Sequence, residues 1–236
     1  MTDSQPGYEF RFLHAEHIPQ ILALQDLVIE NLTDKENYYK ESIDYFQETL
    51  IGEESSLGIF MQGQLIGYNL VSFPKMKAHN LGLDAGLHEK DLLKVAHWGP
   101  AAIHPAFQRQ GLLKNIITRQ LHKLTNKGYE HILLTVAPRN YPSLRFVLQQ
   151  GFLIKQLKLK YGNLLRYVLH LNIKHPISNP VCRVSVSGAD LDSQQFMLNL
   201  GFYGYAVREG QNGVELLFGH DGFSGQILTR HTGKGG

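Results

Sequence analysis

The sequence is poor in the residues that form cross-links and thiolate metal sites. Its 236 residues contain a single cysteine, Cys182, so no disulfide can form within the chain and no set of thiolates can bind zinc. The histidines are scattered and lack acidic partners at the spacing of metal ligands. We therefore expect no metal site, and we interpret the chain as a protein of a reducing compartment, the cytoplasm.

Long hydrophobic runs and an excess of charge of one sign are also missing. The 23 Lys and Arg residues nearly balance the 21 Asp and Glu residues, which gives no electrostatic reason to expect nucleic acid. No segment is long and apolar enough to span a bilayer, and residues 1–10 do not resemble a signal peptide. Any binding of an anion must therefore come from a local site.

What the sequence does contain is the periodicity of a mixed α/β (α+β) protein. Apolar residues recur at strand or helix spacing through the first 172 residues, and residues 74–93 are expected to form a polar loop with one helical turn. The expected order is strand 8–13, helices 17–32 and 37–51, strands 57–61, 65–73 and 95–103, helix 111–124, strand 131–136, helix 141–150, and strands 152–160 and 164–171.

A smaller unit follows this region. Residues 182–220 predict a strand, a helix and two strands, and a shift of fifty positions aligns them with residues 132–170 with seven identities in 39 positions. Either a decayed internal duplication or independent use of a common β-α-β-β arrangement explains this similarity. We therefore expect a main domain at 8–172, a linker at 173–181, the β-α-β-β unit, and a flexible tail at 221–236.

A polar turn, QRQGLL at residues 108–113, precedes the predicted helix 111–124. The N-terminus of a helix leaves backbone N–H groups unpaired and carries the positive end of the helix dipole. Gly111 would let a bulky anion approach the backbone, and Arg109 could add a charge-assisted hydrogen bond. The turn is therefore either a phosphate or diphosphate site or only a solvated helix start.

Two motifs in the right order resemble the GNAT superfamily of acyl-CoA-dependent N-acyltransferases. The first is Gln108-Arg-Gln-Gly-Leu-Leu after a predicted strand that ends at His-Pro, and the second is Asn140-x-x-Ser143 followed by Gly151-Phe152. The resemblance covers about residues 8–172. It implies the GNAT fold, a mixed and mostly antiparallel sheet flanked by helices, here with a small C-terminal β-α-β-β extension.

The resemblance also implies an activity, the transfer of an acetyl (acyl) group from acetyl-CoA to a primary amine of a small molecule or peptide. It assigns cofactor binding to Ala101, Ala102, Ile103, Gln108, Arg109, Gln110, Gly111, Leu112, Leu113, Asn140, Ser143 and Phe146. The turn would hold the diphosphate, and the strand and the later helix would hold the pantetheine arm. In relatives a strand N–H binds the oxyanion, here Ala102 or Ile103. Leu113 departs from the family, which usually has a small residue there.

The usual proton-transfer residues are missing from both expected positions. Gly99 stands where many relatives have a glutamate base, and Val147 stands where a tyrosine acid is common. His97 could act as a base or water relay, and Tyr141 could protonate the leaving thiolate. The alternatives are a buried structural histidine and a tyrosine that packs or caps its helix. Pro100 also suggests a bulge that would break the alternation between His97 and Gly99.

The sequence gives little information about the amine that accepts the acyl group. Asp44, Glu48, Glu53 and Glu54 could attract a cationic amine, or they could form a solvated acidic face. The missing base and acid also leave a second hypothesis open, a non-catalytic acyl-CoA-binding or sensing module with a C-terminal interaction element. A further expectation is that residues 182–218 either continue the main sheet or form a homodimer interface.

Overall fold

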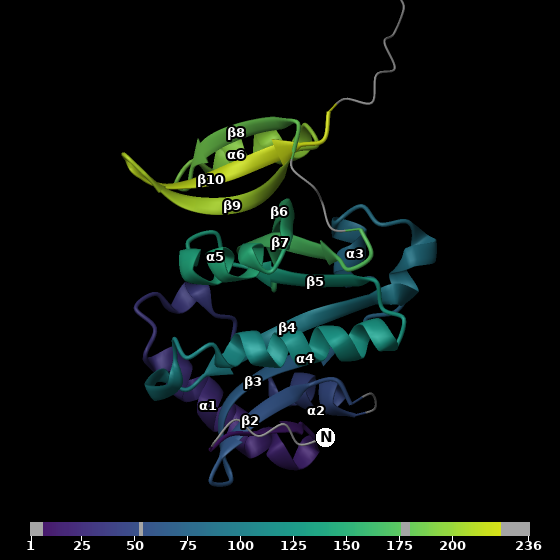
Figure 1. Ribbon diagram of the computed structural model, residues 1–236, viewed down its shortest axis with the longest axis vertical. Helices are drawn as coiled ribbons and strands as arrows, with labels where there is room; N and C mark the ends of the chain where they lie inside the picture. Colours follow the sequence, from purple (N-terminus) through teal and green to yellow (C-terminus); the bar gives the residue numbers. More distant parts are fainter. Residues whose placement is uncertain (1–6, 52–53, 176–179, 223–236) are drawn as a thin grey trace, which may run out of the picture.

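The computed structural model describes residues 7–51, 54–175 and 180–222 and contains a ten-stranded sheet (Figure 1). The strand order is β1-β2-β3-β4-β5-β7-β6-β9-β10-β8, and among the paired strands only β4 and β5 run parallel. The strands are β1 Glu9–Phe12, β2 Leu57–Met61, β3 Gln64–Ser72, β4 Val95–Ile103, β5 His131–Val136, β6 Leu153–Lys160, β7 Leu164–Asn172, β8 Cys182–Ser187, β9 Tyr203–Gly210 and β10 Gly213–His220.

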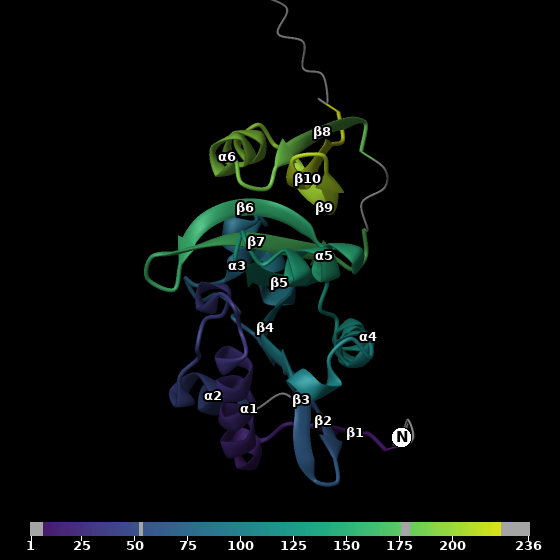
Figure 2. The ribbon, with the colours of Figure 1, turned by 90° about the vertical axis from the view of Figure 1, so that its left-hand side faces the viewer.

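Helices cover both faces of this sheet, with α1 and α2 on one side of the central strands and α4 on the other (Figure 2). The helices are α1 Ile18–Glu30, α2 Ile43–Leu50, α3 Leu81–Asp84, α4 Leu112–Asn126, α5 Tyr141–Gln149 and α6 Leu191–Asn199. None of the helices in the described ranges has the length and apolar character needed to cross a membrane. The predicted mixed fold and its order of elements are confirmed.

One predicted helix is shorter than expected. Instead of a helix over 37–51, the chain forms a short 3-10 turn at Lys35–Asn37 and then α2 from Ile43. Ser42 caps α2, because its Oγ accepts a hydrogen bond from the Tyr45 N–H at 3.2 Å. Residues 38–42, between this turn and α2, form neither helix nor strand.

The strands β4 and β5 pair only at their beginnings. Their register runs from Val95 opposite His131 to His97 opposite Leu133 and then stops. On the other side of β4, Gly99 and Pro100 form a bulge against β3, as the proline suggested. Their neighbours Trp98 and Ala101 pair with Val71 and Asn69, so two residues of β4 lie opposite one residue of β3. The bulge accompanies the divergence of β4 from β5.

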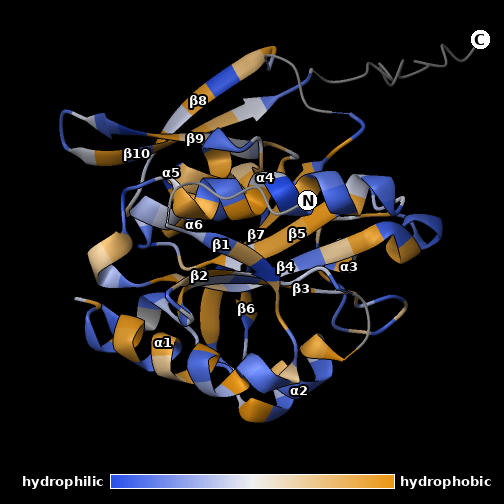
Figure 3. Cartoon of the chain, turned by 60° about the horizontal axis from the view of Figure 1, so that its bottom comes forward, coloured by the Kyte–Doolittle hydropathy of each residue, from blue (hydrophilic) through white to orange (hydrophobic). Residues whose placement is uncertain are grey.

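Helix α4 is fixed to the sheet by a buried amide as well as by apolar contacts. Figure 3 shows α4 alternating between hydrophilic and hydrophobic residues, while the nearby strand β5 is largely hydrophobic. Gln120 is 1% exposed, accepts a hydrogen bond from Asn69 Nδ2 at 2.7 Å and donates to the Ser55 and Asn69 carbonyl oxygens, both at 2.9 Å. Since buried polar groups need such partners, the contact holds the middle of α4 beside β3.

The C-terminal strands cross β6 and β7 rather than extending them side by side (Figures 1 and 2). Pairing between β6 and β9 is limited to Ile154 opposite Gly204. One hydrophobic core nevertheless includes residues of both parts, such as Ile154, Tyr167, Leu198 and Phe218. The predicted tail falls largely outside the described residues, as do residues 176–179 of the predicted linker.

Candidate active site

A cavity of about 830 Å³ opens where β4 and β5 diverge. Its walls come from β4, β5, the first turns of α4 and α5, the segment before α2, the insert before α3, and the turn between β6 and β7. A volume of this size lies within the range of small-molecule and cofactor sites. The chain therefore has a cleft at the position that the sequence motifs indicate.

Five of the predicted cofactor residues line this cavity, namely Ala101, Leu113, Asn140, Ser143 and Phe146. The Asn140 Oδ1 accepts a hydrogen bond from the Ser143 N–H at 3.2 Å and caps α5. The Asn-x-x-Ser motif thus fixes the start of α5, and the helix presents Phe146 to the same space.

The backbone of β4 offers hydrogen-bonding groups to the opening. The His104 N–H donates to the Ile66 carbonyl on β3 at 2.8 Å. Because groups alternate along an antiparallel ladder, Ile103 and Ala101 then direct their N–H and C=O groups away from β3, toward the open side. The Ile103 carbonyl accepts from Gln108 Nε2 at 3.2 Å, in agreement with this direction. Ala102 is buried, and its backbone faces β3 instead.

The turn at 108–111 is exposed and lies outside the cavity lining, at the N-terminus of α4. Arg109 and Gly111 both adopt left-handed backbone conformations, with φ of 62° and 74°. The first helical bond of α4 runs from the Asn115 N–H to the Gly111 carbonyl, so the preceding N–H groups point out of the helix end. The Gln110 Oε1 accepts from the Tyr8 hydroxyl at 2.9 Å, which helps hold this turn.

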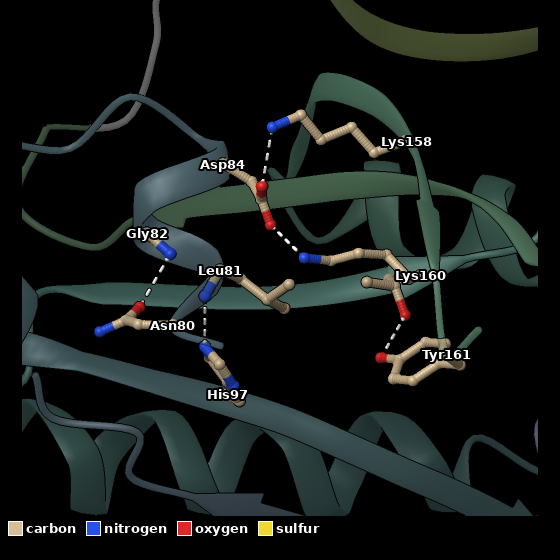
Figure 4. A network of polar contacts seen from close by, with 9 residues as sticks. Asn80, Leu81, Gly82, Asp84, His97, Lys158, Lys160 and Tyr161 are labelled. Carbon is tan, nitrogen blue, oxygen red and sulfur yellow. Dashed lines mark hydrogen bonds and ion pairs between the residues drawn. The ribbon is translucent and has the colours of Figure 1, made fainter. Parts of the chain in front are cut away.

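His97 lines the cavity, but its ring is already used in a structural contact. The His97 Nε2 accepts a hydrogen bond from the Leu81 N–H at 3.0 Å (Figure 4). Burial, with smaller contributions from His79 and Lys160, lowers the pKa of His97 to about 3. The ring is therefore neutral near pH 7, and its acceptor nitrogen is occupied, which favours the structural alternative for this residue.

Tyr141 does not reach the cavity. Its hydroxyl lies against Gly188, where a Cβ would come within 2.7 Å of the Tyr141 Oη, and Tyr141 is not among the residues that line the cleft. The physical reason is its place at the first position of α5, on the side of the helix that meets the C-terminal strands. The predicted acid is thus placed away from the site.

Four lining side chains that no sequence motif marked come from the segment before α2, from α2 itself and from the turn between β6 and β7. Tyr38, Glu41, Tyr45 and Tyr161 line the same cavity. Burial raises the pKa of Glu41 to about 7. A tyrosine-rich, acidic stretch is visible in the sequence, but no short motif distinguishes Glu41 from its exposed neighbours.

The acidic residues named from the sequence are dispersed. Only Glu48 lines the cavity, whereas Asp44 is exposed outside it. Glu54 forms a long ion pair with Lys123 at 3.8 Å, and Glu53 lies outside the described residues. They do not form the acidic entrance that the sequence suggested.

The insert before β4 is tied to the cavity by ion pairs. Asp84 of α3 binds Lys160, which lines the cavity, and Lys158 at 2.9 Å (Figure 4). Partial burial opposes ionisation of Asp84, but hydrogen bonds from the two lysines outweigh it and lower its pKa. Within the ranges that the structure describes, no group of three or more His, Cys, Asp or Glu residues could hold a metal ion.

A sheet that opens beside a helix N-terminus, with a bulged strand exposing backbone groups to the opening, defines the class of acyl-CoA-dependent N-acyltransferases. Residues 21–152, more than half of the chain, match the model of the acetyltransferase (GNAT) family. The chain belongs to this family. Comparison with curated proteins gives no sequence match.

Solved structures with a similar fold include three GNAT-type proteins. The ribosomal-protein-S18-alanine N-acetyltransferase of Escherichia coli has 14% identity and a TM-score of 0.52, with 74% of this chain and 98% of that chain covered. The loading GNATL domain of CurA from Lyngbya majuscula has 17% identity and a TM-score of 0.54, covering 71% and 98%. PaiA N-acetyltransferase of Thermoplasma acidophilum, solved with coenzyme A, has 14% identity and a TM-score of 0.50, covering 70% and 98%. These likenesses concern the fold.

As a GNAT acetyltransferase, the protein transfers an acetyl group from acetyl-CoA to an amine. Membership of the family identifies the acyl donor and the reaction. The residues that bind the donor and promote the reaction are inferred from the geometry of this chain.

Proposed function

We propose that this chain acetylates the primary amine of a small molecule or peptide by binding acetyl-CoA across the opening between β4 and β5. The observation that carries the proposal is the end of β4–β5 pairing at His97 and Leu133, beside a cavity whose wall includes the first turn of α4. The turn at 108–113 holds the diphosphate through backbone N–H groups, helped by Arg109.

The pantetheine arm pairs with the exposed backbone of β4. An extended chain of amides can add to an unpaired strand edge, and Ala101 and Ile103 present such an edge. The same geometry favours Ile103 over Ala102 as the donor to the oxyanion of the tetrahedral intermediate. A donor of this kind contributes about 3 kcal/mol to transition-state stabilisation.

A pair of matched glycine variants tests the diphosphate site. Gly111 and Gly128 flank the two ends of α4, both have positive φ, and a Cβ at either position would meet no other atom within 4 Å. Gly111→Ala and Gly128→Ala should therefore cost similar stability through backbone strain. Only Gly111→Ala should weaken acetyl-CoA binding in titration calorimetry, by about tenfold, because its methyl group and strain affect the anion site. Equal affinities for the two variants would contradict the proposed site.

The second hypothesis, a non-catalytic acyl-CoA-binding module, is motivated by Gly99, Val147 and the position of Tyr141. Thiol release from acetyl-CoA with a panel of primary amines separates the two functions. An enzyme releases thiol in proportion to added amine, whereas a sensing module binds acetyl-CoA without amine-dependent release.

Location in the cytoplasm and assembly as a homodimer belong to the same proposal. The exposed, unpaired Cys182 supports a reducing compartment. Sedimentation of the full chain tests the dimer, which predicts twice the monomer mass at micromolar concentration.

A further inference from the structure

Glu41 lines the cavity together with tyrosines from the segment before α2, from α2 and from the turn between β6 and β7. We call Tyr38, Tyr45, Tyr68 and Tyr161 the tyrosine cluster. The pKa of each is raised, mainly by burial and in smaller part by the negative charge of Glu41. The Tyr38 and Tyr68 hydroxyls are 3.2 Å apart, and the Tyr161 hydroxyl lies 2.9 Å from Thr135 Oγ1 on β5. Glu41 and three members of the cluster line the cavity.

A buried amide fixes the backbone of Glu41. Gln25 on α1 is 0% exposed, donates to the Glu41 carbonyl at 3.3 Å and accepts from the Glu41 N–H at 3.1 Å. The carboxylate itself has no hydrogen bond or ion pair within the part of the chain that the structure describes. The segment before α2 is thus held in place while its acidic group stays available to a ligand.

The cluster also fills the space where a base on β4 would stand. A Cβ at Gly99 would lie 2.6 Å from the Tyr45 hydroxyl. A glutamate could not occupy position 99 without displacing Tyr45. The glycine on β4 and the tyrosine side chain from α2 therefore depend on each other, because Tyr45 occupies the space that a side chain at position 99 would need.

We infer that Glu41 is the general base of this acetyltransferase and that the cavity-lining tyrosines of the cluster, Tyr38, Tyr45 and Tyr161, bind the acceptor as a small cationic amine with one positive charge. The inference rests on the proposed function, because it needs acetyl-CoA in the β4–β5 opening. Tyrosine faces attract an ammonium group, and the Glu41 carboxylate balances its charge. Tyr39 stacks on Tyr161 with ring centroids 4.6 Å apart and extends the aromatic wall.

The charges around the cavity select against polycations. Besides Glu41, its lining carries the acidic Glu48 and the basic or titratable residues Lys75, Lys77, His79, His97, Lys160 and Arg166. Of these, His97 is neutral near pH 7 and Lys160 is paired with Asp84. Lys75 and Lys77, on the same lining, repel a second positive charge on the acceptor.

The proton balance of the step is complete without a further reactant. The ammonium group gives one proton to the Glu41 carboxylate, and the free amine attacks the thioester carbonyl to form the C–N bond. The tetrahedral intermediate breaks the C–S bond, and the second proton of the nitrogen goes to the leaving thiolate. Glu41 then releases its proton to solvent, which leaves an amide, coenzyme A and one proton.

The test compares Glu41→Gln with Glu30→Gln, an exposed position at the end of α1. Three quantities are measured for each variant and for the wild type. Calorimetry gives the affinity for acetyl-CoA and, in the presence of coenzyme A, for 2-phenylethylamine. Thiol release gives kcat/KM for 2-phenylethylamine between pH 5.5 and pH 9.

The wild type should bind 2-phenylethylamine, and its kcat/KM should fall as the pH decreases below about 7, where Glu41 takes up a proton. Glu41→Gln should lower kcat/KM at least about 100-fold and remove this acidic limb, with unchanged affinity for acetyl-CoA. Glu30→Gln should match the wild type. A wild type that binds acetyl-CoA but not 2-phenylethylamine, or a Glu41→Gln variant that keeps its rate and acidic limb, would overturn the inference. If the wild type does not bind acetyl-CoA, the proposed function itself is refuted.

Discussion

Two parts of this molecule have the same elements in the same order, but only one of them forms a wall of the cavity. We call residues 131–172 the first unit and residues 182–220 the second unit. Asn140 and Asp190 cap their helices in the same way, through bonds from the N–H groups of Ser143 and Ser193 at 3.2 and 3.0 Å. The shared local structure therefore does not by itself create a cofactor site.

The difference lies in what stands beside each unit. In the first unit, β5 adjoins the diverging strand β4, and Phe146 on α5 lines the resulting cavity. In the second unit, β8 is the last strand of the sheet, and the equivalent Phe196 is 61% exposed. A β-α-β-β unit becomes a wall of the site only where a neighbouring strand separates from it beside a helix N-terminus.

The two units also pack against each other in a reciprocal way. Helix α5 of the first unit contacts β9 of the second, and α6 of the second contacts β6 of the first. Under the shift of fifty positions, α5 corresponds to α6 and β6 to β9. The helix of each unit therefore contacts, in the other unit, the strand that follows the helix there. Reciprocal contacts of this kind are expected of a duplicated unit, although the duplication itself stays a prediction.

The largest difference between the units should appear when their equivalent Gly-Phe aromatics are truncated. Phe152 is 0% exposed and packs on Trp98 with ring centroids 5.1 Å apart, whereas Phe202 is partly buried against His220 at 5.0 Å. Phe152→Ala should reduce the free energy of unfolding by about 3–5 kcal/mol, and Phe202→Ala by about 1–2 kcal/mol. Urea denaturation measures both, and equal losses would mean that the second unit is packed as tightly as the first.

The contact between the units should be broken by a single added methyl group. A Cβ at Gly188 would lie 2.7 Å from the Tyr141 hydroxyl and 3.0 Å from the Val214 carbonyl oxygen. Gly188→Ala should therefore cost about 1–3 kcal/mol of stability through overpacking. The double variant with Tyr141→Phe should recover part of the loss, because the hydroxyl is removed. No recovery would place the strain at the Val214 carbonyl rather than between the two units.

The sequence predicts most of the fold because its signals are local. Apolar periodicity specifies the strands and helices, and Pro100 indicates the bulge that accompanies the opening of β4. The motif residues Asn140 and Ser143 are likewise brought to the cavity, because a helix cap depends on residues only three positions apart.

The positions of Tyr141 and Glu41 could not be predicted from the sequence because they depend on contacts between distant segments. Tyr141 turns toward Gly188, 47 positions later in the chain, and no local pattern encodes that contact. Glu41 reaches the cavity because Gln25 on α1 fixes its backbone and because the chain before α2 is irregular where the periodicity indicated a helix. The helical pattern is wrong for residues 38–42, where the Tyr38 hydroxyl forms a hydrogen bond with the Tyr68 hydroxyl on β3 instead.

The equivalent phenylalanines of α5 and α6 should separate cofactor binding from stability. Phe146→Ala removes an apolar group from the cavity wall and should weaken acetyl-CoA binding by about tenfold, which corresponds to about 1.4 kcal/mol. Phe196→Ala removes an exposed side chain and should leave the affinity unchanged and stability within about 0.5 kcal/mol. Calorimetry and urea denaturation measure the two quantities. A cofactor effect of Phe196→Ala would mean that the second unit contributes to the site.

The smallest expected difference concerns pH, because one helix cap is an amide and the other a carboxylate. Hydrogen bonds from Ser193 lower the pKa of Asp190 below its ordinary value of 3.8. A lowered pKa contributes stability that is present above pH 4 and is lost as the pH falls through the folded-state pKa, since the unfolded chain takes up the proton first. Asp190→Asn should therefore flatten the fall in unfolding free energy between pH 4 and pH 2, whereas Asn140→Asp should make it steeper. If Asn140→Asp leaves that pH dependence unchanged, the two caps are not equivalent in their surroundings, and the likeness of the units ends at the backbone.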